Sequence, residues 1–437
     1  MTATGAPEHA PAPAAEPAPQ QAVGRPLAIV LGLLTIFGPI SMDLYLPVLP
    51  ALTAELGSTT SVAQLTITAC LLGLAIGQVV AGPLSDRFGR RKPLLIGVIA
   101  YTVTSVLCAL SPTIETLILA RFVQGLAGAV GIVIAQAAGR DVYSGGKLIR
   151  YYGRLTVLGG LAAIIGPVIG GQLATFTDWR GVFLFLAAVG VAILVASLLV
   201  FRETLPKEHR ITGGLSHTLN DFRRLLADRR FVGAVLITGF TYSAIFAYLS
   251  GATYILQGMY GLSPQEYSLA FGLNSLGFVI FGFISGRLAE HWSERGTLAA
   301  GLAMALAGAL GLLATALLQL PLIAIILSLF TMVSGVAVTS PPATSLALKD
   351  YPDIAGTASS LLGLARFAFG GLAAPLVGIG GANDPVPFGI VAAAAAAAAA
   401  LCLGLVGRRR TASSAVSNPG GGVDGPAGAG GAGPDGR

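Results

Sequence analysis

Twelve runs of mainly apolar residues follow one another along this chain, and each is long enough to cross a bilayer as a helix. A membrane-spanning helix needs about 20 such residues. Six runs precede a polar stretch at 202–230, and six follow it. The runs lie near 27–49, 61–81, 93–112, 116–138, 152–176 and 181–201, and then near 231–256, 265–288, 297–317, 321–346, 354–380 and 386–406. The pattern predicts an all-α integral membrane protein in which twelve helices form two six-helix bundles.

The composition excludes a soluble globular domain. Only 11% of the residues are charged and 54% are hydrophobic, whereas a soluble domain carries about 25% charged residues. The chain has no lysine-containing phosphate loop for ATP. The four histidines, which lack the spacing of metal ligands, are His9, His209, His217 and His291. We therefore expect no enzyme activity, no cofactor and no metal site.

The polar segments set the expected domain boundaries. The first segment is rich in Ala and Pro and the last in Gly and Pro, compositions that do not form a packed core. The predicted parts are a disordered cytoplasmic N-terminal tail (1–26), an N-terminal bundle (27–201), a cytoplasmic central loop (202–230), a C-terminal bundle (231–406) and a disordered cytoplasmic C-terminal tail (407–437).

Basic residues fall on one side of the runs. Of the 26 Lys and Arg residues, 23 lie in segments on the side of the two termini, and Arg180 alone lies in a loop on the other side. Cytoplasmic loops carry such an excess of Lys and Arg. We therefore predict a multi-pass protein of the inner or plasma membrane with both termini cytoplasmic. The same bias explains the net charge of +6 without a nucleic-acid partner.

Asp43 is the only carboxylate in the interior of an apolar run, in the sequence SMDLYLP at 41–47. An ionised acid in hydrocarbon costs about 2.5–3.5 kcal/mol on insertion scales. A buried acid is therefore a candidate proton carrier and suggests proton-driven transport. At a helical rise of about 1.5 Å per residue, Asp43 lies about 24 Å from Leu27 but only about 9 Å from Leu49. An interfacial acid that water reaches is the alternative interpretation.

Two arginines, Arg121 and Arg366, also lie inside apolar runs. Arg121 lies at a depth close to that of Asp43, so the two could pair when Asp43 is ionised; the alternative is a structural arginine bonded to backbone carbonyls. Arg366 lies about 18 Å along the eleventh run, too deep for its head group to reach the interface easily. It could bind carbonyls, structural water or substrate. Two buried arginines against one acid favour neutral or anionic substrates over permanent cations.

The loop between the second and third runs has the sequence GPLSDRFGRRK at 82–92. Its glycines permit close approach or unusual backbone dihedrals, and its acid can bind an arginine or a helix N-terminus. We predict a charged latch that must break when the two bundles move apart; an ordinary basic loop is the alternative. A weaker copy, GRLAE at 286–290, follows the second run of the other half. The residues expected to form the latch are Gly82, Asp86, Arg87, Gly89 and Arg90.

Small residues recur in the fifth run together with a proline. A proline inside a helix removes a backbone hydrogen bond and kinks the helix, and glycines let helices pack closely. The residues of this pattern are Gly153, Gly166, Pro167 and Gly170. Plain packing glycines are the alternative interpretation.

These motifs resemble the major facilitator superfamily. The loop at 82–92 is similar to its signature loop between helices two and three, and Arg121 with Gln124 and Gly125 is similar to its fourth-helix pattern. The fifth run resembles the pattern associated with antiporters, with Ala162 in place of a glycine. The resemblance implies the major facilitator fold, alternating access, and a fifth helix that seals the inner side against proton leak.

Four short segments narrow the resemblance to the bicyclomycin/chloramphenicol-resistance type of drug:proton antiporter. They are DLYLP at 43–47, Gly77-Gln78, Gly272-Leu273-Asn274 and GTASS at 356–360. This subfamily implies a membrane-embedded acid at Asp43 and proton-coupled efflux of small amphipathic compounds or antibiotics. A proton-coupled importer of a small metabolite and a non-transporting membrane sensor are the alternatives. The expected partners are a small drug-like molecule, protons and the lipid bilayer, and the expected state is a monomer.

Polar and aromatic residues within the runs suit an adaptable drug cavity. The residues predicted to line it are Tyr45, Gln124, Tyr242, Asn274 and Arg366. The tyrosines and amides could instead pack structurally or anchor the helices at the interface.

Overall fold

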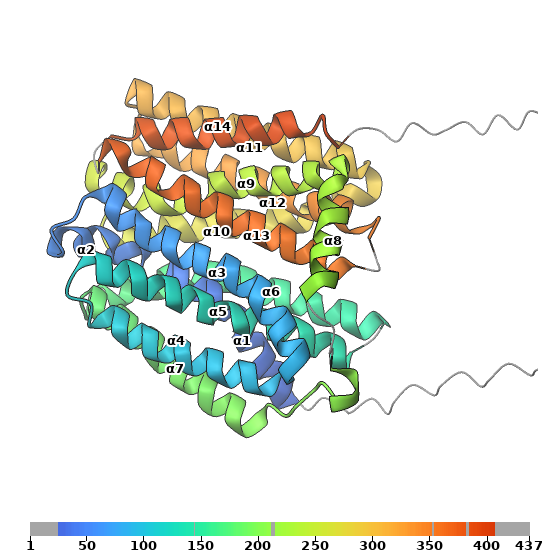
Figure 1. Ribbon diagram of the computed structural model, residues 1–437. Helices are drawn as coiled ribbons and strands as arrows, with labels where there is room; N and C mark the ends of the chain where they lie inside the picture. Colours follow the sequence, from blue (N-terminus) through green and yellow to red (C-terminus); the bar gives the residue numbers. More distant parts are fainter. Residues whose placement is uncertain (1–24, 144, 211–214, 352–353, 382–383, 407–437) are drawn as a thin grey trace, which may run out of the picture. The chain divides into compact units, whose positions relative to one another are not determined.

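The computed structural model describes residues 25–143, 145–210, 215–351, 354–381 and 384–406. Within these ranges the chain is helical and contains no β-strand (Figure 1). The two tails that were predicted to be disordered lie almost entirely outside the described residues.

Each apolar run of the N-terminal half coincides with helical structure. Side chains cap three of the helix starts: the backbone N–H groups of Val62, Thr116 and Gly181 donate to Thr59 Oγ1, Thr113 Oγ1 and Asp178 Oδ1. The elements are α1 (Arg25–Asp43), η1 (Leu46–Val48), α2 (Leu49–Glu55), α3 (Thr60–Phe88), α4 (Arg91–Ala109), α5 (Ile114–Val142), α6 (Gly145–Leu173) and α7 (Trp179–Val200).

The C-terminal half repeats the pattern with α9 (Arg229–Tyr254), η3 (Ile255–Met259), α10 (Pro264–His291), α11 (Glu294–Leu318), α12 (Leu322–Leu348), α13 (Ala355–Val377), η4 (Gly378–Gly380) and α14 (Val386–Cys402). Ten segments in the described part of the chain are long and apolar enough to span a membrane, and shorter apolar helices lie in α6 and α14. These twelve segments confirm the predicted all-α membrane fold.

The central segment 202–230, expected to be a loop, contains a single turn, η2 (Lys207–His209), and the helix α8 (Leu215–Ala227). α8 packs against α9 and α13 and buries Leu225 completely. A short helix that buries only one apolar stripe leaves a weak hydrophobic signal in the sequence. The polar composition of 202–230 therefore predicts a loop even though part of it is helical.

The first span is not one continuous helix. α1 ends at Asp43, a turn follows, and the chain continues as η1 and α2. Pro47 and Pro50 cannot donate backbone hydrogen bonds, and a proline disfavours helical dihedrals in the residue before it. The run 27–49 therefore crosses as an interrupted helix, and the interruption begins directly after the acid.

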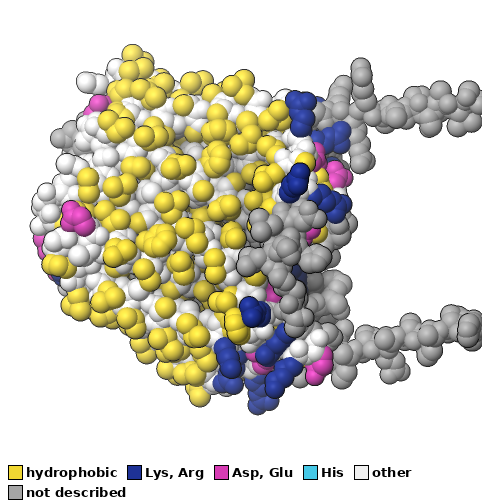
Figure 2. All heavy atoms as spheres, viewed as in Figure 1, with side chains coloured by type: hydrophobic (Ala, Val, Ile, Leu, Met, Phe, Trp, Pro, Cys, Tyr) yellow, Lys and Arg dark blue, Asp and Glu magenta, His cyan; other side chains and the backbone are white. Residues whose placement is uncertain are grey.

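The helix ends define two faces of the molecule. The basic face holds Arg25 at the start of α1, Arg90 between α3 and α4, and Lys349 after α12. The far face holds Glu55 at the end of α2 and Arg180 at the start of α7. Figure 2 shows Lys and Arg side chains gathered at one end of the helices, with apolar side chains along their sides. This separation agrees with the uneven spread of basic residues along the sequence.

Six hydrogen bonds join the two halves near the far face. Thr253 Oγ1 and Gln257 Nε2 donate to the carbonyls of Leu46 and Pro47, at 2.8 and 3.1 Å. These carbonyls are available because the helix is interrupted after Asp43. The other four bonds pair Thr53 with Tyr254 Oη (2.7 Å), Gln64 with the Ser250 carbonyl (3.0 Å), Ser61 with the Pro375 carbonyl (3.0 Å) and Thr68 with the Gly371 carbonyl (2.8 Å). We call these six bonds the far-face gate.

Candidate functional site

Asp43 is buried between helices of both halves, with an exposed fraction of 5%. α6 approaches it through small residues. A Cβ built on Gly166 would lie 3.1 Å from the Asp43 Cβ, and one on Gly170 would overlap the carbonyl oxygen of the residue after Asp43. The predicted fifth-span motif and the predicted acid therefore meet, and Pro167 is buried beside them. Gly153 lies in α6, and its surroundings fall outside the described residues.

Two tyrosines of the C-terminal half lie across the junction from Asp43. Tyr248 of α9 and Tyr267 of α10 are within electrostatic reach of its carboxylate. Asn274 Nδ2 donates a hydrogen bond to Tyr248 Oη at 3.1 Å, and the Tyr248 ring stacks on Phe271 with centroids 5.2 Å apart. Asp43 is therefore an acid enclosed between the halves, and it is not a carboxylate at the water interface.

Several polar atoms of this group lack partners. Among the described residues, no hydrogen bond or ion pair reaches the Asp43 carboxylate. Tyr267 Oη and Asn274 Oδ1 are buried and likewise unpartnered there. A buried charge without a partner costs free energy, and buried polar atoms without hydrogen bonds are rare in folded proteins. Chemically, the group can exchange a proton or bind a molecule that supplies the missing bonds.

Arg121 is fully buried inside the N-terminal half and does not contact Asp43. Its Nη1 donates to the Ser41 carbonyl at 3.2 Å and to Gln124 Oε1 at 2.5 Å. The guanidinium carbon lies 4.4 Å from the centroid of the Tyr45 ring. Residues 41 and 43 point in nearly opposite directions, because successive helical residues are rotated by about 100°. The arginine therefore reaches α1 on the side away from the acid.

Tyr45 and Gln124, expected in the substrate cavity, instead surround Arg121. Both are 0% exposed. Gln124 Nε2 donates to Ser105 Oγ at 2.7 Å, and Tyr45 Oη shares a hydrogen bond with Thr66 Oγ1 at 3.1 Å. Together these residues form a closed polar core of the N-terminal half. The other predicted cavity residues lie in the C-terminal half: Asn274 beside Tyr248, and Arg366 over Tyr242.

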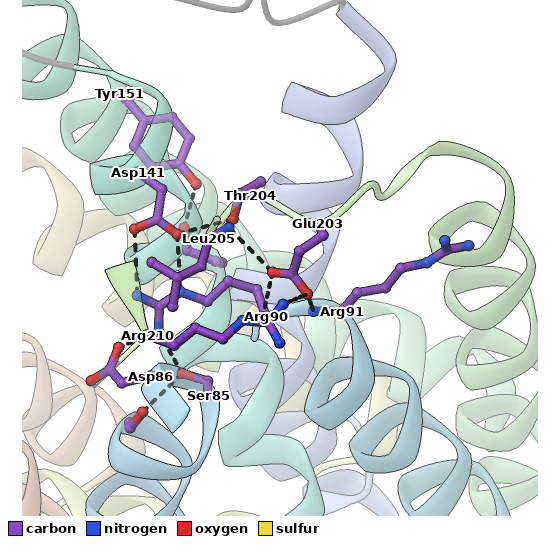
Figure 3. Close-up of polar contacts among 12 residues, drawn as sticks. Ser85, Asp86, Arg90, Arg91, Asp141, Tyr151, Glu203, Thr204, Leu205 and Arg210 are labelled. Carbon is purple, nitrogen blue, oxygen red and sulfur yellow. Dashed lines mark hydrogen bonds and ion pairs between the residues drawn. The ribbon is translucent and has the colours of Figure 1, made fainter. Parts of the chain in front are cut away.

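Arg90 is the centre of a polar network at the basic face (Figure 3). Its side chain is buried and donates to Ser85 Oγ at 2.7 Å, Asp86 Oδ1 at 2.5 Å and Asp141 Oδ2 at 2.9 Å. Burial acts to lower the pKa of Arg90, but the hydrogen bonds and charges of Asp141 and Asp86 outweigh burial and raise it. The guanidinium is therefore held in its charged form by carboxylates at the ends of α3 and α5.

Glu203 fixes the backbone of the same loop. Its carboxylate accepts hydrogen bonds from the backbone N–H groups of Arg90 at 2.7 Å and Arg91 at 3.3 Å, at the start of α4, where a negative charge is favoured. Gly89 has φ of +86°, and a Cβ there would overlap the Glu203 carboxylate. Both the dihedral and the space therefore require glycine. Arg210 completes the network with an ion pair to Glu203 at 3.6 Å.

The predicted latch residues fall into two groups. Asp86, Gly89 and Arg90 take part in the network of Figure 3. Gly82 has open space where a Cβ would stand, and the Arg87 guanidinium lies 5.4 Å from the centroid of the Phe88 ring. The contacts named above fasten α3, α4 and α5 to the segment after α7, and none of them extends to α9–α14.

Sequence reasoning missed three polar residues of these sites. Asp141 follows the fourth run and Glu203 follows the sixth. Acids just after a run, on the same side as a basic loop, are therefore a signal that could have found both. Tyr267 gives no such signal, because an aromatic residue near the start of a span reads as an interfacial anchor.

Comparison with known proteins identifies the family. Residues 31–375 match the profile of the Major Facilitator Superfamily. The uncharacterized MFS-type transporter YdgK of Bacillus subtilis is 37% identical over 367 residues, which cover 84% of this chain and 91% of that protein. The bicyclomycin resistance protein homolog of Haemophilus influenzae is 29% identical over 349 residues, which cover 80% and 88%.

A solved structure supports the same assignment at the level of the fold. The crystal structure of a D-xylose-proton symporter superimposes with a TM-score of 0.69 at 16% sequence identity, over 85% of this chain and 96% of that chain. The profile match, the relatives and the fold confirm the resemblance that the motifs carry. The protein is therefore a multi-pass membrane transporter and not an enzyme, and the chain belongs to the Major Facilitator Superfamily.

Proposed function

We propose that this protein exports small amphipathic compounds, antibiotics among them, in exchange for protons. The observation that carries the proposal is Asp43, the one carboxylate of the described spans that is enclosed at the junction of the two halves without a bonded partner. The name of one relative, a bicyclomycin resistance protein homolog, supports antibiotics as substrates. The excess of Lys and Arg at the basic face supports a cytoplasmic location for that face and both termini, in the inner or plasma membrane. We expect the monomer to be the transporting unit.

The proposed cycle gives the Asp43 group access to the two sides of the membrane in turn. With the far-face gate formed, substrate enters from the basic face. When the gate opens, substrate leaves and Asp43 takes a proton from outside. The neutral acid lets the gate re-form, and the proton is then released inward. One charge crossing 100 mV is worth about 2.3 kcal/mol, which is enough to bias such an equilibrium.

The neighbours of Asp43 suggest supporting roles. Close packing of Gly166 and Gly170 against α1 would keep water from the basic side away from the acid. Arg121 would act as a positioning residue, because its bond to the Ser41 carbonyl fixes the end of α1 that carries Asp43. The Arg90 network would hold the loop after α3 rigid and would rearrange as a latch when the halves move.

The test compares wild type with Asp43→Asn in inside-out membrane vesicles energised to pump protons inward. We expect wild type to release protons on addition of bicyclomycin or chloramphenicol, and to accumulate the drug until a protonophore is added. Asp43→Asn should abolish both signals while its amount in the membrane stays unchanged. Glu55→Gln, which neutralises a carboxylate at the far face, is the matched control and should behave as wild type.

Two results would contradict the proposal. Full proton-coupled drug movement in Asp43→Asn would remove the acid from the mechanism. A fall in the drug content of intact cells on addition of the protonophore would indicate an importer. An exporter predicts that the drug content of the cells rises.

A further inference from the structure

Arg366 lies at mid-depth in the membrane-spanning helix α13. Eleven residues separate it from the helix start at Ala355, and eleven separate it from the end at Val377, or about 17 Å in each direction. A lipid head group does not reach this depth, and a charged side chain exposed to hydrocarbon is costly. The partly exposed guanidinium therefore belongs to the interior between the helices.

The surroundings of Arg366 are aromatic. Its guanidinium carbon lies 4.3 Å from the centroid of the Tyr242 ring on α9. Tyr242 neighbours Phe246 with centroids 6.4 Å apart, and Phe246 neighbours Phe367 at 6.1 Å. We call Tyr242, Phe246 and Phe367 the aromatic cluster. A ring face attracts a cation but leaves its N–H groups free to donate.

Arg366 also lies where the two halves meet. One turn before it, a Cβ built on Gly363 would overlap Oε1 of Gln78, which belongs to α3 of the N-terminal half. One turn after it, Gly370 packs against the Phe246 ring of α9. The arginine therefore stands at the junction of α3, α9 and α13.

The positive charge of Arg366 is not compensated. Its Nε is buried without an acceptor, and no hydrogen bond or ion pair reaches its side chain from the described residues. The only carboxylate in the interior of an apolar run is Asp43, and the groups that its charge reaches are Tyr248 and Tyr267. A guanidinium within a membrane span that lacks an acceptor costs free energy, which an anion bound beside it would recover.

We infer that Arg366 and the aromatic cluster form a substrate subsite for organic anions, in which the guanidinium binds a carboxylate or similar oxyanion and the rings receive the apolar body. The inference rests on the proposed export function, since it names the substrate class of that transporter. Arginine suits this role because its planar fork donates two parallel hydrogen bonds to a carboxylate. Gln78 of the N-terminal half packs against Gly363, one turn from Arg366, so binding of an anion at Arg366 can influence the relative movement of the halves.

The test measures binding of two matched probes, 2-naphthoate and its neutral amide 2-naphthamide, to the full chain in lipid nanodiscs by calorimetry. Wild type should bind naphthoate more tightly than naphthamide. Arg366→Gln should weaken naphthoate binding by at least about tenfold and change naphthamide binding by less than about twofold. Arg366→Lys should retain part of the preference, because it keeps the charge but loses the fork.

A matched control and two further variants sharpen the result. Arg287→Gln removes an arginine that lies over the Phe283 ring near the basic face, and it should leave both probes unchanged. Tyr242→Leu should weaken both probes, whereas Tyr242→Phe, which keeps the ring, should weaken neither. Equal affinity of wild type for the two probes would overturn the inference. So would unchanged naphthoate binding in Arg366→Gln, or equal loss of both probes in Arg366→Gln when that variant unfolds at the wild-type temperature.

This experiment separates the inference from the export proposal, because binding is measured without a proton gradient. Selective loss of naphthoate in Arg366→Gln would support the subsite even if Asp43→Asn still exported drugs. Protonophore-sensitive export of chloramphenicol, with no naphthoate preference in wild type, would support export and overturn the subsite.

Discussion

Two arginines lie within membrane spans, Arg121 in the N-terminal half and Arg366 in the C-terminal half, and their environments are opposite. Arg121 is 0% exposed and is bonded to a carbonyl, to an amide oxygen and to an aromatic face. Arg366 is partly exposed, and among the described residues its guanidinium contacts an aromatic face but no hydrogen-bond acceptor. Nε lacks an acceptor in both arginines. The contrast therefore lies in the Nη groups, which are bonded in Arg121 and have no acceptor among the described residues in Arg366.

The difference follows from what the neighbouring helices offer. α1 ends at Asp43, two residues after Ser41, whose carbonyl accepts a hydrogen bond from Arg121. Gln124, one turn from Arg121 on the same helix, supplies a second acceptor. Residues one turn from Arg366 are Gly363 and Gly370, which have no side chain to accept a bond. The Gln78 amide and the Phe246 ring fill the space at these two glycines, and no hydrogen bond from the described residues joins either of them to Arg366.

Replacing each arginine by leucine should give the largest difference in stability between the two sites. Arg121→Leu leaves the Ser41 carbonyl and Gln124 Oε1 without their donor in a closed core, so we expect a loss of about 3 kcal/mol or more in stability. Arg366→Leu removes one cation–π contact and should cost less than about 1 kcal/mol. Thermal unfolding of both purified variants in one detergent measures the contrast. Equal losses would mean that Arg366 has structural bonds like those of Arg121.

The amide that supports Arg121 should show the next largest effect. Gln124→Leu removes the acceptor at 2.5 Å from Nη1 and the donor to Ser105, which should cost about 1–3 kcal/mol. Gln78→Leu is the matched control, since Gln78 lies close to Gly363 near the other arginine and should cost less than about 0.5 kcal/mol. Thermal unfolding again gives the readout. A larger loss in Gln78→Leu than in Gln124→Leu would reverse the assignment of the two environments.

Giving Arg366 an acceptor should make it resemble Arg121. Tyr242→Gln places an amide oxygen beside the guanidinium, and the new charged hydrogen bond should slightly exceed the lost cation–π contact, for a gain of up to about 1 kcal/mol. The same bond competes with a bound anion, so 2-naphthoate should bind several-fold more weakly. Calorimetry and unfolding on the same sample test both parts. A variant that binds naphthoate more tightly would contradict the competition.

The smallest effect concerns an ion pair in contact with water. The Lys349 hydrogen bond is the main cause that lowers the pKa of Glu294 from its usual value of 4.5. Because the folded-state pKa is the lower one, the pair stabilises at pH above 4.5 and loses that effect as the pH falls through the folded-state pKa. Solvent screening limits the contribution to less than about 0.5 kcal/mol. Glu294→Gln should therefore lower the unfolding temperature slightly at pH 7, by an amount that shrinks on acidification toward pH 4.

The sequence predicted the spans and the depth of the acid, because hydropathy and helical rise report position along the membrane normal. It did not predict that Arg121 and Asp43 are apart. Depth places two residues at one level but says nothing about the direction in which each points. On α1 the arginine bonds the Ser41 carbonyl, a backbone group that sequence patterns do not reveal.

Other features could be predicted only in part. The fifth-span glycines were singled out from the family resemblance, but their contact with the residue after Asp43 depends on how two helices cross. The prolines at 47 and 50 were visible, yet the interruption after Asp43 was not expected, because proline also occurs within helices here, as Pro167 does in α6. Asp141 and Glu203 reach Arg90 from 51 and 113 residues away, and local patterns do not record such distances.

The interruption of the first span has a consequence for how this transporter can evolve. Two bonds of the far-face gate end on the main-chain oxygens of Leu46 and Pro47, and substitution of those side chains leaves the oxygens in place. The donors, Thr253 and Gln257, are side chains that a single mutation can remove. Selection for faster or slower turnover can therefore adjust how easily the far face opens from one half of the protein alone, while the acid-bearing half stays unchanged.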